Sequence, residues 1–387
     1  MIRAAFLATA ALFAASALAQ DSAPPPPSLY ALPPAAGGVA ESERDAADQA
    51  LAMMGREDRI PPETRQTCAN AEGAAIESIV LRAREARVVI INEAHEQPRN
   101  RAFIEDLAAA LHAAGYKTYA SDSLARSAAR DEPVHARITD GDFTAEPTSG
   151  ALLSALRTLG YRIVPFEASN APPAGRHFTD QINARETAYA SSLINRTIQT
   201  GDGSKVLVHV GFGRNRETLE RIDRRNVRWM ALQLREITGI DPLTIDQTSY
   251  VSDRTGVCAF NSDGSALPTD RDIYVAHPPL AFERERPTWR LARGQRFADI
   301  PRALKNQDER VIYEARYANE PDDAVPADRI LVDPGEDIPL LLAPGRYRVR
   351  AWTQDGAWTR STPLTVAAPT PPAPQKARPK STRRKKK

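Results

Sequence analysis

The feature that most constrains the fold is an alternation of short apolar segments with longer amphipathic segments between residues 87 and 246. Apolar runs of four to six residues are typical of strands that are buried on both faces of a parallel sheet. They occur at 87–92, 118–123, 161–166, 205–210 and 243–246. Amphipathic segments that predict helices separate them, at 103–114, 150–159, 184–199 and 225–238. This order favours βαβ units, so we expect an α/β fold with a mostly parallel sheet flanked by helices.

A different pattern follows the α/β region. Apolar residues alternate with arginines at 346–351, as in a half-buried strand, and Pro-Gly and Asp-Gly turn signals interrupt the segment from 311 to 366. We therefore expect a small C-terminal antiparallel β module over 306–367 and an α/β core domain over 61–305. Within the core domain, 69–87 also has helical periodicity.

The two ends of the chain have the composition of a leader and a tail. Residues 1–19 contain one charge, an apolar run and a small-x-small ending, which predict a removable signal peptide and hence a periplasmic or secreted protein. Residues 20–60 are Pro-rich and are expected to be disordered except for a short helix at 47–54. The tail, 368–387, is Pro-rich and then polybasic. It is expected to be disordered and to contact anionic envelope polymers or lipid.

The positive net charge comes from that tail. Residues 376–387 contain eight Lys or Arg side chains and no acid, so the rest of the chain is acidic. An acidic body argues against specific nucleic-acid binding. The chain has two cysteines, Cys68 and Cys258. Export to an oxidising compartment favours a disulfide between them, and two buried free thiols are the alternative.

Polar residues follow the predicted strands, at the sheet edge where ligands of α/β proteins bind. They are Glu93 and His95, Asp122, Glu167, Arg214 in a Gly-rich turn, and Asp246. Carboxylates that meet at one edge repel one another unless a cation, a proton or an arginine separates them. These residues are therefore the candidate site, with Glu93, His95, Asp122 and Glu167 as candidate catalytic groups.

Glu93 and His95 form the most informative pair because residues two apart at a strand end point the same way. They could hold a divalent metal ion, or act as a base and the group that orients it. The alternative is structural, with Glu93 accepting backbone N–H groups and His95 capping the loop. His209 lies among valines and leucines, so we expect it to be a core histidine.

Arginines near these strand ends could hold an anionic substrate or stabilise developing negative charge. The candidates for substrate binding are Arg99, Arg185, Glu186 and Arg214. Arg99 and Arg101 could also neutralise the acidic cluster, and for both of them the alternative is an ordinary surface charge. For Arg185 and Glu186 the alternative is a charge pair in the first turn of the predicted helix.

Five segments together resemble the erythromycin-esterase-like, ChaN-like and Tiki-type superfamily, especially its exported bacterial members with an INEAH motif. They read VVIINEAHEQPRNRAFIEDLAAALHAAGY, YASDSL, GYRIVPFEA, NARETAYASSLI and KVLVHVGFGRNRE, and the similarity extends over about 70–250. The resemblance implies an α/β sheet with a polar cleft and hydrolytic chemistry, and some relatives bind metal or haem. It places family site residues at Glu93, His95, Asp122, Glu167, Arg185 and Glu186.

One family position differs in a chemically important way. The motif of the fourth strand usually ends with a histidine, and this chain has Arg214 there. A guanidinium is neither a base nor a metal ligand at ordinary pH. Three functions therefore stay open. They are an exported hydrolase of ester, lactone or amide bonds in a small molecule or peptide, a periplasmic protein that binds a metal, haem or anion without catalysis, and a degenerate member with an envelope interaction role.

Overall fold

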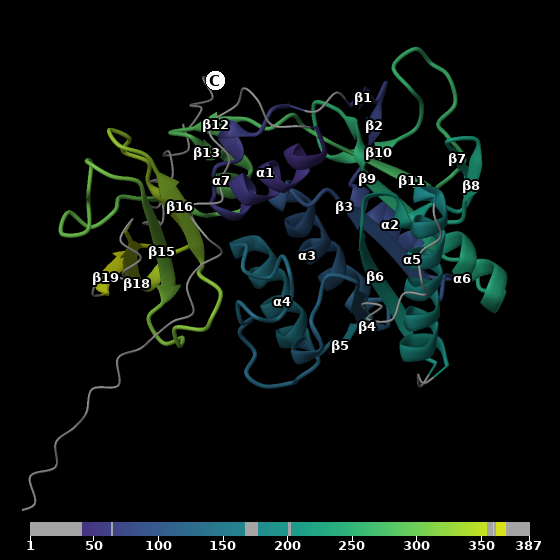
Figure 1. The fold of residues 1–387 in the computed structure, drawn as a ribbon, viewed down its shortest axis with the longest axis horizontal. Helices are drawn as coiled ribbons and strands as arrows, with labels where there is room; N and C mark the ends of the chain where they lie inside the picture. The colour runs from purple at the N-terminus through teal and green to yellow at the C-terminus, as the bar shows by residue number, and fades with distance from the viewer. Residues whose placement is uncertain are drawn as a thin grey trace, which may run out of the picture.

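The computed structural model describes residues 41–62, 65–166, 177–199, 203–353, 359 and 361–368. The predicted signal peptide, residues 20–40 of the leader and nearly all of the basic tail lie outside these residues. A helix-flanked sheet and a smaller all-β part lie side by side (Figure 1). Within the described ranges, no helix combines the length and apolar character needed to cross a membrane.

The main sheet has nine strands and confirms the predicted α/β class. Its order is β2-β10-β11-β9-β3-β6-β4-β5, and β1 pairs with β9. The five strands predicted from the sequence form one continuous half, β9-β3-β6-β4-β5, in which every neighbouring pair is parallel. The strands are β1 (Gln66–Thr67), β2 (Ala71–Glu72), β3 (Val88–Glu93), β4 (Tyr116–Ser121), β5 (Arg162–Pro165), β6 (Lys205–Gly211), β9 (Leu243–Val251), β10 (Gly256–Cys258) and β11 (Ile273–His277).

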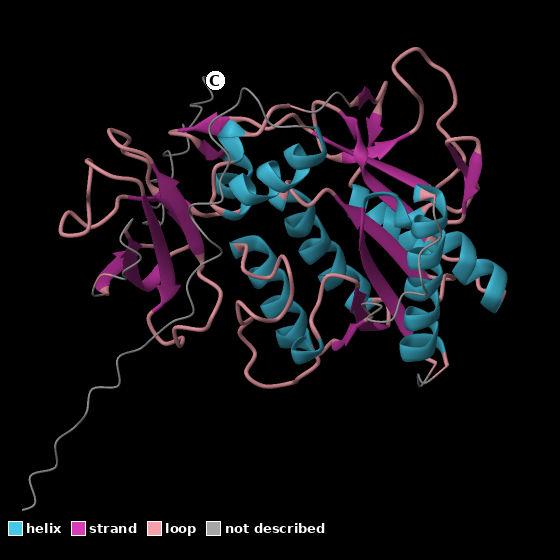
Figure 2. Ribbon diagram, viewed as in Figure 1, coloured by secondary structure: helices cyan, strands magenta, loops and turns pink. Residues whose placement is uncertain are grey.

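Helices cover both faces of this sheet, as Figure 2 shows. Strand side chains alternate between the faces, so Val89 and Ile91 pack with α2, α3 and α4, whereas Val88 and Ile90 pack with α5 and α6. The helices are α1 (Glu41–Met53), α2 (Ala75–Ala83), α3 (Pro98–Ala113), α4 (Pro147–Leu159), α5 (Phe178–Leu193), α6 (Met230–Thr238) and α7 (Thr288–Ala292).

Two predicted helices are shorter than their periodicity suggested. The segment predicted as a helix over 225–238 begins as β8 (Arg225–Val227), which pairs with β7 (Glu220–Ile222), and only then continues as α6. In the segment 69–87, residues of β2 join the sheet edge before α2 begins at Ala75. In both cases pairing with a distant or neighbouring strand overrides the local helical pattern.

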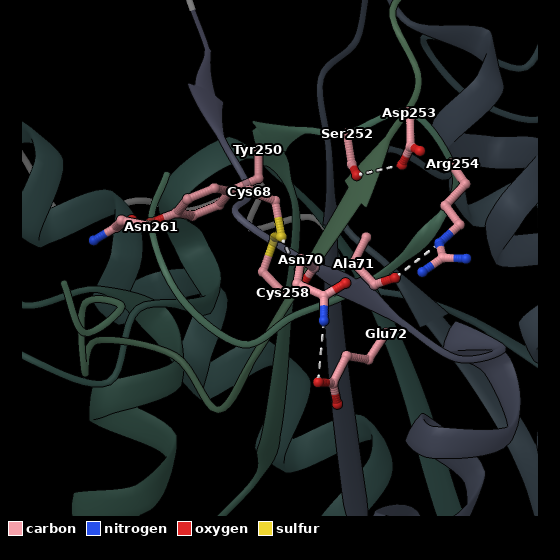
Figure 3. Close-up of a disulfide and its surroundings, with 10 residues drawn as sticks. All are labelled: Cys68, Asn70, Ala71, Glu72, Tyr250, Ser252, Asp253, Arg254, Cys258 and Asn261. Carbon is pink, nitrogen blue, oxygen red and sulfur yellow. Dashed lines mark hydrogen bonds between the residues drawn. A yellow bond between two sulfur atoms is a disulfide. The ribbon is translucent and has the colours of Figure 1, made fainter. Parts of the chain in front are cut away.

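The sheet also continues beyond the last predicted strand. β11 pairs in parallel with β9, and β10 then pairs with β11 and β2 in antiparallel. A disulfide between Cys68 and Cys258 joins the segment before β2 to β10 (Figure 3). Its Cα atoms are 5.6 Å apart, within the usual range for such a bond. The bridge fixes the edge of the sheet across 190 residues of sequence.

The C-terminal β module is an antiparallel sheet in the order β16-β15-β18-β19, with its own apolar core. Two short two-stranded pairs, β12 with β13 and β14 with β17, lie between it and the main domain in sequence. The strands are β12 (Phe282–Glu283), β13 (Arg286–Pro287), β14 (Arg296–Ala298), β15 (Val311–Tyr317), β16 (Asp328–Val332), β17 (Leu340–Leu342), β18 (Gly345–Trp352) and β19 (Thr362–Val366).

A buried group of charges, the Asp328 cluster, joins the module to the rest of the protein. Arg286 donates two hydrogen bonds to the Asp328 carboxylate, at 2.7 and 2.8 Å, and Arg290 of α7 donates another. The backbone N–H of Leu341 completes the set at 2.6 Å. Arg286 and Asp328 are fully buried, so this cluster is a closed ionic contact.

Candidate functional site

Strand order and side-chain parity bring three polar residues together on the sheet face that α3 covers. β3 lies beside β6, and β6 lies beside β4, so Glu93, His209 and Tyr119 come from three neighbouring strands. Side chains alternate between the two faces along a strand, and each of these three lies on the same face as the apolar residues that pack against α3. These three side chains, with His95, Arg101 and Glu146, are called the Glu93 cluster below.

Glu93 is the centre of the cluster and is 2% exposed. Arg101, from the first turns of α3, donates to both of its oxygens at 2.8 Å. The same guanidinium reaches Glu146 at 3.2 Å, and Glu146 also accepts the Thr148 and Ser149 N–H groups at the start of α4. Burial alone would raise the pKa of Glu93, but Arg101, His209 and His95 outweigh it and hold the pKa well below its usual range.

His95 lies between this buried carboxylate and the protein surface. Its Nδ1 is 2.8 Å from Glu93 Oε1, and its ring stacks on Phe143 at a centroid distance of 4.2 Å. Phe212 contacts the ring edge-on at 5.0 Å. The side chain is 15% exposed, unlike that of Glu93. The carboxylate and the two aromatic rings therefore fix the orientation of an imidazole whose other nitrogen, Nε2, is turned away from Glu93.

His209 is buried, as expected of a core histidine, but it belongs to the cluster. Its Nε2 lies 3.0 Å from Glu93 Oε2, which is within ion-pair distance although the angle is not that of a hydrogen bond. Its Nδ1 is 2.6 Å from the Tyr119 hydroxyl. Burial, together with the negative charges of Glu93 and Asp122, raises the pKa of Tyr119 well above its usual value. Tyr119 therefore stays a neutral phenol that can donate to His209.

Arg214 organises a second group of charges next to the Glu93 cluster. Arg214 follows β6 in a short 3-10 turn, Phe212–Asn215, and donates to Asp122 at 2.5 Å and to Glu186 at 3.2 Å. Its guanidinium also lies over the Tyr189 ring, 4.3 Å from the centroid. Burial raises the pKa of Glu186, an effect that Asp122 increases and Arg214 and Arg185 oppose. One Glu186 oxygen, Oε2, is buried without a hydrogen-bond partner among the described residues.

Gly211, the last residue of β6, lies where the two groups meet. A Cβ atom at this position would stand 2.7 Å from His95 Nε2 and 3.7 Å from Arg214 Nη1. A contact of 2.7 Å is too short for any side chain, so only glycine lets the imidazole approach the strand this closely. The same two distances show that His95 Nε2 and the Arg214 guanidinium flank one small region.

The other predicted site residues have different positions. Arg99 turns away from Glu93 and donates to the carbonyl oxygen of Pro278. Arg185 is half exposed and lies 3.5 Å from the buried Glu186, at the edge of the Arg214 group. Asp246 accepts the backbone N–H groups of Thr248 and Ser249, a local structural role. Glu167 lies outside the described residues.

The sequence made both Arg99 and Arg101 candidates for neutralising the acidic cluster, and only the direction of each side chain on α3 separates their roles, because Arg101 binds Glu93 and Arg99 binds the Pro278 carbonyl oxygen. Other residues of the site had no recognisable sequence signal. Tyr119 and Glu146 become site residues through strand order and the start of α4. Phe143 lies in a loop with no motif. A histidine inside an apolar strand, such as His209, was the one visible hint of a buried polar cluster.

The donor atoms do not fit the metal site predicted at Glu93 and His95. Both Glu93 oxygens already accept hydrogen bonds from Arg101, so a metal ion there would need to displace a buried guanidinium. In the part of the chain that the structure describes, no group of three or more His, Cys, Asp or Glu side chains is arranged to hold a metal ion. Haem binding stays a prediction.

Neither a protein-family model nor a curated protein sequence matches this chain. Among solved structures, it is similar to RRSP, a MARTX toxin effector domain from Vibrio vulnificus, with a TM-score of 0.34, 16% identity, and coverage of 47% of this chain and 36% of that one. For the type III effector HopBA1 the TM-score is 0.34, with 15% identity and coverage of 55% and 98%. A structure described as bacterial protein toxins has a TM-score of 0.32, 13% identity, and coverage of 47% and 37%. The superfamily resemblance stays a prediction.

Proposed function

We propose that this protein is a hydrolase of ester, lactone or amide bonds in which His95 is the general base. The observation that carries the proposal is the pairing of His95 Nδ1 with a buried, ionised Glu93, at 2.8 Å, in a histidine side chain that is itself 15% exposed. A carboxylate that accepts the Nδ1–H group leaves the lone pair on Nε2. A neutral imidazole in that tautomer can accept a proton from water.

The reaction follows from that tautomer. A water molecule at His95 Nε2 attacks the substrate carbonyl carbon and forms a new carbon–oxygen bond. One proton of that water moves to Nε2. The resulting imidazolium is stabilised by the Glu93 carboxylate, in the way that a buried acid supports histidine in hydrolytic triads. When the tetrahedral intermediate collapses, the carbon–oxygen or carbon–nitrogen bond of the substrate breaks, and His95 gives its proton to the leaving group.

Arg101 and His209 support this step through their contacts with Glu93. Arg101 keeps Glu93 ionised by donating to both of its oxygens, so Glu93 orients His95 and does not take the proton from it. His209, bound to Tyr119, lies 3.0 Å from Glu93 Oε2, the oxygen that His95 does not contact. They are positioning residues because they act through Glu93.

Arg214 is the group we assign to the developing oxyanion. Asp122 and Glu186 bind its Nη1 and Nε atoms and hold the guanidinium beside Gly211, where His95 Nε2 also lies. A fixed positive charge at the point where negative charge develops is the most effective form of electrostatic catalysis. An arginine can fill this role although it cannot replace a histidine as a base, which gives the departure from the family motif a chemical meaning.

A pair of substitutions tests the proposal on the purified full chain. The substrates are a p-nitrophenyl ester, an aryl lactone and a fluorogenic peptide. His95→Gln removes the base and is expected to lower kcat by roughly 100-fold or more without changing the melting temperature by more than a few degrees. Arg185→Gln, which changes a half-exposed arginine of the neighbouring helix, is the matched control and should keep wild-type rates. Equal activity in His95→Gln and wild type would contradict the proposal.

We also propose that the protein acts outside the cytoplasm, in the periplasm or as a secreted protein. The N-terminal segment has the pattern of a signal peptide, and a disulfide between Cys68 and Cys258 suits an oxidising compartment. Fractionation of cells that express the full chain, with thiol labelling before and after reduction, tests this. We expect a processed protein outside the cytoplasm with no free thiol, and a cytoplasmic protein of full length would contradict the proposal.

A further inference from the structure

A cavity with charged walls lies beside the loop between β3 and α3, and the mechanism proposed above does not use it. Its volume is about 490 Å³, which is within the usual range of small-molecule sites. The residues that line it come from the loop before α3, the 3-10 turn Glu57–Arg59 with the segment after it, the end of β9, and the residues before β13. We call it the Arg99 cavity. Figure 1 shows β12 and β13 beside α1 and α7.

Arg99 is the buried cation of this cavity. Residues two apart on a helix differ by about 200° in direction, so Arg99 and Arg101 leave the start of α3 on opposite sides. Arg99 is 9% exposed and donates from Nη1 to the Pro278 carbonyl oxygen. Its Nε is buried without a hydrogen-bond partner among the described residues. A buried guanidinium with an unused N–H group, on a cavity wall, is a donor for an anionic ligand.

A second cation and an amide lie on the same walls. Arg65 also lines the cavity, and burial together with the charge of Arg65 lowers the pKa of Arg99 to about 10, against an opposing effect of Glu57. Two like charges that repel each other are stabilised by an anion between them. Gln97, which is 8% exposed, has a buried Oε1 without a partner among the described residues. Rotation of that amide would present its NH₂ group to the same ligand.

The acidic residues on the walls do not cancel this charge at neutral pH. Asp58 is ion-paired with Arg56 at 2.9 Å. Burial raises the pKa of Glu57 to about 7, so about half of these carboxyls are neutral there. Glu96 is the remaining carboxylate on the wall. One carboxylate and a fraction of a second therefore face two guanidinium groups, which favours a ligand with a single negative charge.

The rest of the lining is apolar and continuous with these donors. It consists of Ile60, Pro61, Pro62, Val251, Pro279, Leu280 and Phe282. Phe282 is 38% exposed at the rim. Burial of hydrocarbon against such a wall is favourable because it removes apolar surface from water. A ligand for this cavity therefore needs both a singly charged anionic head and an apolar body.

We propose that the Arg99 cavity is a binding site for an amphipathic organic carboxylate. The carboxylate head accepts hydrogen bonds from Arg99 and pairs with Arg65, and the hydrocarbon body lies against the proline, leucine and phenylalanine wall. The site is separate from the Glu93 cluster, since Arg99 and Arg101 diverge. It does not depend on the hydrolase proposal, because binding is measured without turnover.

Calorimetric titration of the full chain with decanoate, below the concentration at which decanoate aggregates, tests the proposal. Acetate carries the head without the chain, and decylammonium carries the chain with the opposite charge. Both are expected to bind at least about tenfold more weakly than decanoate. Arg99→Gln should weaken decanoate binding by about tenfold or more. Phe282→Ala, at the exposed rim, should weaken it about threefold and leave the melting temperature unchanged.

His95→Gln separates this site from the candidate active site, because a carboxylate is also a product of ester hydrolysis. Decanoate binding that is unchanged in His95→Gln and lost in Arg99→Gln supports the Arg99 cavity. Three other outcomes would each overturn the proposal. Binding could be lost in His95→Gln and kept in Arg99→Gln, it could be unchanged in both Arg99→Gln and Phe282→Ala, or decanoate at about 5 mM could fail to bind to the wild-type protein. If Arg99→Gln lacks a native melting transition, the Phe282→Ala result decides.

Discussion

The Glu93 cluster and the Asp328 cluster both bury a carboxylate against arginine, yet they differ in how completely the carboxylate is enclosed. Asp328 receives two arginines and a backbone N–H, and every partner is buried. Glu93 shares its oxygens between Arg101 and two histidines, and one of these, His95, is partly exposed. The first arrangement has no group left to react. The second keeps a titratable nitrogen at the edge of an otherwise closed network.

This difference shows which buried charges are candidates for catalysis. A buried ion pair alone is weak support for function, since structural contacts between parts of a protein use the same residues. The feature that separates the two clusters is an ionisable group that is oriented from the inside and reachable from the outside. By that criterion, His95 is a candidate base, whereas Arg286 and Arg290 hold the β module in place.

The largest effect on stability is expected when the Asp328 cluster loses its carboxylate. Asp328→Ala leaves Arg286 and Arg290 buried without their partner, and the free energy of unfolding should fall by about 3–5 kcal/mol. Urea denaturation, followed by circular dichroism, measures this. Hydrolytic activity at a temperature where the variant is folded should stay within about twofold of wild type. A loss of less than about 1 kcal/mol would show that the cluster is not the closed contact described above.

The next effect concerns Glu57, whose carboxyl lies between the two clusters. Burial raises its pKa to about 7, Glu146 adds to the shift, and Arg290, Trp289 and Arg286 oppose it. The folded protein therefore binds a proton that an unfolded glutamate, with a pKa of about 4.3, has already lost. Stability from this group is full below about pH 4 and decreases as the pH rises to about 7, by on the order of 3 kcal/mol.

Glu57→Gln tests that pH dependence, because the amide does not titrate. Urea denaturation at several pH values between 4.5 and 8 should give a smaller decrease in the free energy of unfolding for the variant than for wild type. Glu93 has the opposite sign, because its lowered pKa stabilises the folded state above about pH 4 and loses that stability as the pH falls further. Parallel curves for Glu57→Gln and wild type would count against a raised pKa at Glu57.

A smaller effect is expected from a substitution that disturbs the Glu93 cluster without removing a charge. Gly211→Ala places a methyl group 2.7 Å from the His95 ring, so the imidazole must move away from Glu93 or Arg214. Overpacking of this kind costs about 1–3 kcal/mol. Activity should fall by about tenfold while Gly239→Ala, at a helix end with no nearby atoms, affects only stability. Wild-type activity in Gly211→Ala would mean that the close approach of His95 is unimportant.

The smallest effect is expected at Arg185, although the sequence places it among the candidate site residues. Its side chain is half exposed and its contact with Glu186 is 3.5 Å long. Solvent screens a guanidinium that is half exposed, so a long contact of this kind contributes about 0–1 kcal/mol. Arg185→Gln should therefore change the melting temperature and the hydrolysis rate only marginally. A loss of activity comparable to that of His95→Gln would move Arg185 into the site.

Local contacts of the site were accessible from the sequence, whereas its distant contacts were not. Glu93 and His95 contact each other because they are two residues apart at a strand end, which periodicity alone indicates. The contact of His209 with Glu93 requires β6 to lie next to β3, although more than 100 residues separate the two strands. The bidentate bond from Arg101 requires α3 to pack on that same face of the sheet.

The sequence by itself therefore determined the α/β class, the five strands of the parallel half of the sheet and the polar residues at their ends, because hydrophobic period and turn residues are local properties of the chain. The tertiary structure decided the order of those strands, the added edge of β10 and β11, and the separation of Arg99 from Arg101 into two different environments. Those features depend on which apolar faces pack together over long sequence distances. Packing of that kind follows from the shape and volume of the whole core, which no short segment encodes.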